Sequence, residues 1–150
     1  MLRPSLLVAL VLALTAAAPA LAALMTGGGT GTVAVRSVEV IRQADGNVIQ
    51  ERSLEGTVSG ALTGTYVEDV RGVVKSSGNV TFVGTMVFEG TVTGCGTGTL
   101  VLRVEGRAVS GLPTSEGRLT TIGGGTLDVR GTATFTQVGP ALAYEAQYVC

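Results

Sequence analysis

The chain has 150 residues, 23 glycines, a formal net charge of −1 at pH 7, and neither His nor Trp. So balanced a charge does not predict nucleic-acid binding, which needs a clustered basic face, and it offers no polybasic patch for an anionic membrane. The lack of histidine excludes the Ser-His-Asp triad, the Cys-His pair and His-based zinc sites. Any catalysis would have to use carboxylates, tyrosines or the shape of a cavity.

The N-terminal residues have the pattern of a secretory signal peptide. It consists of a basic residue, a short apolar run, a breaking proline and an A-x-A cleavage signal: Arg3, Leu6–Ala18, Pro19 and Ala20-Leu21-Ala22. The apolar run is shorter than the roughly 20 residues of a membrane span, and an uncleaved anchor is the alternative. We expect residues 1–22 to be removed and the mature protein to be secreted or periplasmic, without membrane attachment after cleavage.

Residues 23–31 are expected to be a flexible lead-in, and residues 32–150 are predicted to form one β-domain. Nearly all of this domain alternates apolar and polar positions with a period of two, as half-buried strands do. The first predicted hairpin joins Val33–Ile41 to Val48–Leu54 through the turn Asp45-Gly46-Asn47.

An internal repeat follows this hairpin. The stretch EGTVSGALTGTYVEDVRG begins at Glu55 and returns as EGTVTGCGTGTLVLRVEG at Glu89, 34 residues later. Each copy has the pattern of a strand, a glycine-rich turn and a second strand. Pairing such units buries a face that one unit cannot bury alone, so the repeat predicts successive hairpins of one sheet.

The remaining strands are separated by glycine-rich turns. The alternation is clearest in Val80–Val92, and the last strand is expected at Ala141–Tyr148. About eight strands with short connections predict an all-β fold, either a sandwich or a small antiparallel up-and-down barrel. Glycines inside the strands favour the barrel because they mark bulges or tight bends that let a sheet coil: positions 56, 84, 90, 106 and 131.

Three segments carry a resemblance to a known family: FEGTVTGCGTGTLVLRVEG (Phe88–Gly106), IGGGTLDVRGTATF (Ile122–Phe135) and YEAQY (Tyr144–Tyr148). On these segments the chain resembles bacterial proteins of unknown function that have an allene oxide cyclase-like, calycin-like β-barrel. The wider superfamily includes oxylipin and polyketide cyclases, which hold a flexible apolar substrate in a shaped cavity. No catalytic residue of these enzymes aligns with a position here, so the resemblance implies the fold and not the chemistry.

Glu68 is the unusual residue of the predicted strands. It occupies an apolar register between Tyr66 and Val70, where the second copy of the repeat has Leu102. If the register holds, its carboxylate points into the barrel, where burial would raise its pKa or require a partner such as a tyrosine hydroxyl. Glu68 and Tyr66 are therefore the candidate catalytic pair. The alternative is a bulge, a register shift or a rim position that turns Glu68 to solvent.

Other side chains on apolar registers could line a ligand cavity. The candidate ligand-binding residues are Tyr66, Glu68, Phe82, Met86, Phe88, Phe135, Tyr144 and Tyr148. The simpler interpretation is that the aromatic residues and Met86 fill a narrow eight-stranded barrel, with the tyrosine hydroxyls sent to its rim.

Cys95, in a predicted turn, and Cys150, the last residue, are candidates for a disulfide, because an exported protein enters an oxidising compartment. Such a bond would fasten the C-terminal strand to that turn. Two free thiols, or an intermolecular bridge through the terminus, are the alternatives.

The favoured function is an exported barrel that binds a small apolar or amphipathic molecule. The alternatives are a cofactor-independent cyclase or isomerase and a structural or surface protein with a filled barrel. An outer-membrane barrel is disfavoured by the low aromatic content, since such barrels carry aromatic girdles. No cofactor or metal is predicted, because the glycine-rich turns lack the helix of a phosphate site and no EF-hand loop follows Asp45.

Overall fold

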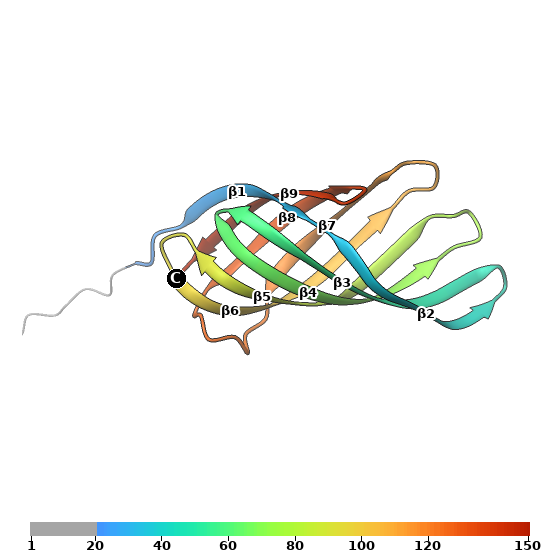
Figure 1. The fold of residues 1–150 in the computed structure, drawn as a ribbon, viewed down its shortest axis with the longest axis horizontal. Coiled ribbons are helices and arrows are strands. Elements are labelled where there is room, and N and C mark those ends of the chain that lie inside the picture. The colour runs from blue at the N-terminus through green and yellow to red at the C-terminus, as the bar shows by residue number, and fades with distance from the viewer. Residues whose placement is uncertain (1–20) are drawn as a thin grey trace, which may run out of the picture.

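The computed structural model describes residues 21–150, so nearly all of the predicted signal peptide lies outside the described residues. The described part contains nine strands joined by short connections (Figure 1). In chain order they are β1 (Met25–Thr32), β2 (Ala34–Ala44), β3 (Asn47–Gly60), β4 (Leu62–Val74), β5 (Val80–Val92), β6 (Gly96–Ala108), β7 (Thr114–Thr121), β8 (Arg130–Val138) and β9 (Ala141–Val149). Residues 21–150 include no helix that is long and apolar enough to cross a membrane.

The strands form one antiparallel sheet that closes on itself. Its order is β1-β9-β8-β7-β6-β5-β4-β3-β2, and β1 also pairs with β3. The last residues of β3, Val58–Gly60, pair with β1, whereas Asn47–Glu55 pairs with β2. The result is a closed eight-stranded barrel with one extra strand, which confirms the predicted antiparallel up-and-down barrel.

The segment expected to be a flexible lead-in, residues 23–31, is instead mostly strand. β1 pairs with β9 from Met25, opposite Tyr148, to Thr32, opposite Ala141. Its glycines allow β1 and β3 to approach closely, because a Cβ on Gly29 would collide with the carbonyl oxygen of Ser59 on β3. The lead-in prediction was therefore wrong, because most of this segment is held in the sheet by its pairing with β9 and β3.

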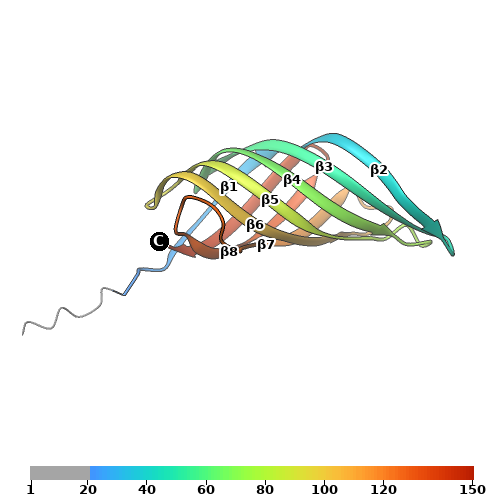
Figure 2. The same cartoon turned by 90° about the horizontal axis from the view of Figure 1, so that it is seen from below.

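β2 leaves the closed part of the barrel. Register shifts after Val35 and after Val40 interrupt its pairing with β3, and such bulges bend an edge strand. The β2–β3 hairpin extends at the end of the molecule opposite the C-terminus (Figures 1 and 2). Its turn has the positive φ angles that the Asp-Gly sequence predicts, 53° at Asp45 and 74° at Gly46. No strand in residues 21–150 pairs with the outer edge of β2, so hydrogen bonds do not close the barrel at this end.

The two faces of the sheet differ as the alternation predicts. Apolar side chains face the interior, and Phe88, Val92 and Val104 are the most buried of the large ones, at no more than 1% exposure. Threonines and charged residues occupy the outside, where ion pairs join neighbouring strands, as Arg71 does with Glu51. The strands from β3 to β9 pair without a register shift, so the in-strand glycines do not mark bulges.

Three of these glycines, Gly56, Gly106 and Gly131, instead lie directly opposite aromatic residues, as do Gly29 and Gly117, whereas Gly84 and Gly90 do not. The directly opposed pairs are Gly29–Tyr144, Gly56–Tyr66, Gly106–Phe82, Gly117–Phe135 and Gly131–Tyr148. An added Cβ on Gly56 would lie 2.7 Å from the Tyr66 hydroxyl oxygen, and one on Gly106 would lie 2.5 Å from the Phe82 ring. Covering a strand glycine with an aromatic ring in this way is known as aromatic rescue. The missing side chains thus make room for the rings that fill the barrel.

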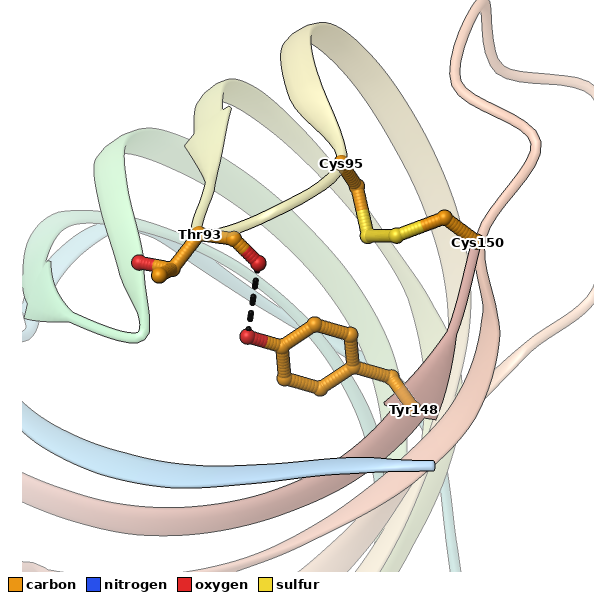
Figure 3. The surroundings of a disulfide bond; sticks show 4 residues. All are labelled: Thr93, Cys95, Tyr148 and Cys150. Atoms are coloured by element: carbon orange, nitrogen blue, oxygen red, sulfur yellow. Dashed lines mark hydrogen bonds between the residues drawn. A yellow bond between two sulfur atoms is a disulfide. The ribbon is translucent and has the colours of Figure 1, made fainter. Parts of the chain in front are cut away.

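A disulfide between Cys95 and Cys150 fastens the C-terminus to the turn between β5 and β6 (Figure 3). The two Cα atoms are 5.5 Å apart. Beside the disulfide, the Tyr148 hydroxyl donates a hydrogen bond to the carbonyl oxygen of Thr93 at 2.9 Å (Figure 3). The two cysteines are therefore joined within one chain, as predicted from the sequence, and not as either alternative had it.

Gly56→Ala is expected to lower the free energy of unfolding by roughly 2–3 kcal/mol, because its methyl group would be forced against the Tyr66 ring and the Thr32 carbonyl oxygen. Gly72→Ala is the matched control on the same inner face, since its nearest new neighbour would be Val80, at an ordinary 3.7 Å. Urea unfolding followed by circular dichroism measures both variants. Equal stability of the two would contradict the close approach at Gly56.

Cys150→Ser is expected to lower the free energy of unfolding by about 4 kcal/mol, because the disulfide closes a loop between residues 55 positions apart. Tyr148→Phe removes only the neighbouring hydrogen bond and should cost about 1 kcal/mol. Reducing agent should destabilise the wild type and leave Cys150→Ser unchanged in the same urea experiment. A Cys150→Ser variant as stable as the oxidised wild type would contradict the role of the disulfide.

Candidate functional site

Two neighbouring cavities lie inside the barrel and share Tyr66, Met86, Leu119 and Leu142 as a common wall. The smaller has a volume of about 50 Å³ and lies toward the disulfide end, where Tyr148 borders it. The larger has a volume of about 160 Å³ and lies toward the β2–β3 hairpin. We call the larger cavity the open chamber, because it adjoins the end of the barrel that hydrogen bonds do not close.

The smaller cavity is bordered by side chains that pack as core. Phe88, Tyr144 and Tyr148, all predicted as ligand-binding residues, line it with at most 7% exposure. The Tyr144 hydroxyl is occupied by the backbone, since it accepts from the Leu62 amide at 2.8 Å and lies 3.1 Å from the Ser59 carbonyl oxygen. The Tyr144 hydroxyl, like that of Tyr148, therefore binds main-chain groups, and the rings of all three residues fill the interior.

The open chamber brings together the other predicted ligand residues, Tyr66, Glu68, Phe82, Met86 and Phe135. The rings of Phe82 and Phe135 lie with centroids 6.4 Å apart and planes inclined by 36°. The rest of the lining is mostly aliphatic, with a few polar side chains: Val33, Val35, Leu54, Val70, Gly72, Val80, Ala108, Leu119 and Leu142, with Gln50, Arg52, Ser115 and Gln137.

The chamber exists beside a glycine that no ring covers. Phe82 has a glycine opposite it on each side, Gly72 on β4 and Gly106 on β6. Its ring leans over Gly106, whereas the nearest atom to a Cβ on Gly72 would belong to Val80, at 3.7 Å. Space is therefore left along β4, on the wall that carries Glu68.

Glu68 faces into this space. β4 pairs without a register shift, and Glu68 lies opposite Leu54 on β3 and Met86 on β5, both of them buried. Burial, and secondarily the charge of Asp69, raises the pKa of the Glu68 carboxyl from 4.5 to about 7. Within residues 21–150 this carboxyl forms no hydrogen bond or ion pair with another side chain. The Glu68 side chain thus points inward, as the alternation of apolar and polar residues predicts, and β4 has no bulge that would turn it to solvent.

Tyr66 lies beside Glu68 on the inner face, but its hydroxyl is used elsewhere. It donates a hydrogen bond to the Thr32 carbonyl oxygen at 2.9 Å, at the point where β1 ends. Burial, followed by the nearby Glu68, raises the pKa of this hydroxyl. Of the two candidate catalytic residues, Glu68 alone presents an uncommitted polar group to the chamber.

Gln50 and Arg52 complete the polar part of the chamber, and the sequence interpretation did not include them. With the Gln50 side-chain amide turned to satisfy both residues, its oxygen accepts from Arg52 Nε at 2.9 Å and from Nη2 at 2.8 Å. Gln50 is buried, whereas Arg52 is exposed. Both have the same even-numbered register as Val48 and Leu54, so alternation could have placed them on the inner face. In the described part of the chain, no three His, Cys, Asp or Glu side chains gather in a way that could hold a metal ion.

No known protein-family profile matches this chain, and no curated protein matches it. Among solved structures, it is similar to a protein of unknown function from the DUF3224 family of Shewanella oneidensis MR-1. The two are 17% identical and align over 84% of this chain and 96% of the other, with a TM-score of 0.68. This similarity supports a small β-barrel fold shared with a protein of unknown function, and the cyclase-like part of the resemblance stays a prediction.

Glu68→Gln is expected to raise the free energy of unfolding at pH 8 by on the order of 2 kcal/mol and to change it little at pH 4. The pKa of the carboxyl rises from 4.5 to about 7 on folding, so the folded state holds this proton more tightly between those values. The stability contributed by the protonated acid is therefore complete below pH 4.5 and is lost as the pH rises through 7.

The charged neighbours of Glu68 are Arg52, facing the chamber from β3, and Asp69, facing solvent on β4, while β5 presents uncharged Met86. Asp69→Asn is the matched control, because this carboxylate is exposed and its charge is the lesser cause of the raised Glu68 pKa, so a smaller change is expected. Urea unfolding of the three proteins at pH 4 and pH 8 makes the comparison. A Glu68→Gln variant less stable than the wild type at pH 8 would contradict the burial of an unpaired carboxyl.

Proposed function

We propose that this protein binds a small apolar or amphipathic molecule in the open chamber. The observation that carries the proposal is an unfilled space of about 160 Å³ with aromatic and aliphatic walls and a few polar groups, as small-molecule sites have. A cavity of about 150 Å³ in a protein core is large enough for benzene. The ligand, or the part of it inside the barrel, is therefore about the size of one aromatic ring, and a polar end can extend past Arg52.

Binding has more support than catalysis. An acid–base mechanism for a cyclase or isomerase needs at least one group positioned to act with Glu68. The Tyr66 hydroxyl, the predicted partner, is engaged with the Thr32 carbonyl oxygen. A chamber with one free carboxyl and no partner positioned beside it is better suited to binding a molecule than to moving protons on it.

The binding site is proposed to work outside the cytoplasm. The disulfide between Cys95 and Cys150 is compatible with an oxidising compartment, where such bonds persist. The same bond fastens the end of the barrel that carries the smaller cavity. The β2–β3 hairpin at the other end has no such fastening, so ligand entry is proposed there.

Gly72→Val is expected to weaken binding of a neutral probe, benzyl alcohol, at least tenfold, because its two methyl groups would occupy the space beside Phe82. The fold should tolerate the change, since a Cβ at this position makes only ordinary contacts. Val73→Leu adds bulk to the outer face of the same strand and is the matched control. Titration followed by NMR chemical shifts of backbone amides measures both affinities.

Chemical-shift changes confined to the chamber lining, lost in Gly72→Val and kept in Val73→Leu, are the expected result. Binding of equal strength to the wild type and to Gly72→Val would contradict the assignment of the chamber. No shift change with benzyl alcohol, toluene or 1-hexanol would contradict the binding function itself.

A further inference from the structure

Glu68 is the charged group that the fold itself does not explain. Several acidic side chains on the outer face form ion pairs, as Glu116 does with Arg107 at the β6–β7 pairing, and the others there face solvent. Glu68 instead faces the interior among Leu54, Tyr66 and Met86. Burying a carboxylate without a partner costs stability, so a residue that serves packing alone would be expected to be apolar, as Leu102 is at the equivalent repeat position.

Arg52, the other charged residue of the chamber lining, does not act as its counter-ion. No ion pair joins Arg52 to Glu68 in the described part of the chain, although the two residues lie on adjacent strands. The Arg52 guanidinium is bound by the Gln50 amide oxygen through both Nε and Nη2, and the side chain is exposed to solvent, which screens its charge. The negative charge of Glu68 is thus open to a group that enters the chamber.

The surroundings of Glu68 are suited to a cation with an apolar body. Phe82 and Phe135 present aromatic rings to the same chamber, and Met86 adds a polarisable side chain beside Glu68. Aromatic faces attract ammonium groups, and this attraction grows when water is excluded. The acidic group and the rings together would therefore prefer an amine over a neutral molecule of equal shape.

We propose that the open chamber binds a protonated amine on an apolar body about the size of a benzene ring, with Glu68 as the counter-ion. This proposal rests on the binding function proposed above and specifies the chemical class of its ligand. The ammonium N–H groups donate to the Glu68 carboxylate, and the apolar body lies against Phe82 and Phe135. Such charge-assisted hydrogen bonds are among the stronger contacts a site can make.

An anionic ligand held by Arg52 is the competing chemistry. Its carboxylate would enter a chamber that already contains the unpaired Glu68 carboxyl, and like charges in one cavity repel. The Arg52 donors are also partly used by Gln50. The anion is therefore an outcome to be tested, and the cation is the ligand that the contacts favour.

The test compares three probes of one shape, benzylamine, benzyl alcohol and phenylacetate, by NMR titration of the mature protein at pH 8. Benzylamine is expected to bind about tenfold more tightly than benzyl alcohol, which corresponds to one charge-assisted hydrogen bond. In Glu68→Gln, benzylamine and benzyl alcohol should bind with about equal affinity, because the counter-ion of the amine is gone. In Asp69→Asn, which removes the adjacent outward carboxylate, the preference should persist.

Each outcome separates the two proposals. Equal affinity for benzylamine and benzyl alcohol in the wild type, or a preference that survives in Glu68→Gln, would overturn the amine proposal and leave the binding function standing. Tighter binding of phenylacetate would overturn it in favour of Arg52. Failure of all three probes to shift any chamber residue would overturn both. Repeating the titration at pH 5 adds a further check, because protonation of Glu68 should reduce the preference for benzylamine.

Discussion

Packing of aromatic rings over strand glycines is the interaction on which the rest of this barrel depends. Five of the six interior rings lie opposite a glycine, which leaves room for them in a narrow barrel, whereas Phe88 lies between Tyr66 and Leu100. The rings then bind the walls together, since Tyr66, Tyr144 and Tyr148 each send a hydroxyl to a main-chain carbonyl of another segment. The pairing of small glycines with large rings thus helps both to fill the barrel and to join its strands.

The same pattern determines where the barrel is not filled. The Phe82 ring can cover only one of the two glycines opposite it. Because it lies over Gly106, space is left beside Gly72. The bulges of β2 add to this opening. They bend β2 away from the part of the barrel that the β1–β3 pairing closes. A carboxyl placed here is largely removed from solvent and has no side-chain partner among the described residues. The raised pKa of the Glu68 carboxyl, about 7, is the electrostatic consequence of that position.

Alternation predicted most of the fold, because a period of two directly reports which side chain faces inward. It placed Glu68 on the inner face and would have placed Gln50 and Arg52 there as well. It could not separate the predicted ligand residues into two cavities, because the direction in which Phe82 leans depends on packing in three dimensions. It also failed at residues 23–31, where close approach to β3 and β9 requires glycine, and a strand of alternating glycines has no apolar pattern to detect.

The larger open space inside the barrel lies beside Gly72, and only a small cavity of about 50 Å³ remains at the disulfide end. A crystal structure of the mature protein under xenon pressure tests this arrangement most directly, because xenon enters apolar cavities without needing a specific contact. Xenon is expected in the open chamber, in contact with Phe82 and Met86, with the Phe82 ring over Gly106. A structure without xenon there, in which the Phe82 ring covers Gly72 and closes the space against Glu68, would contradict it.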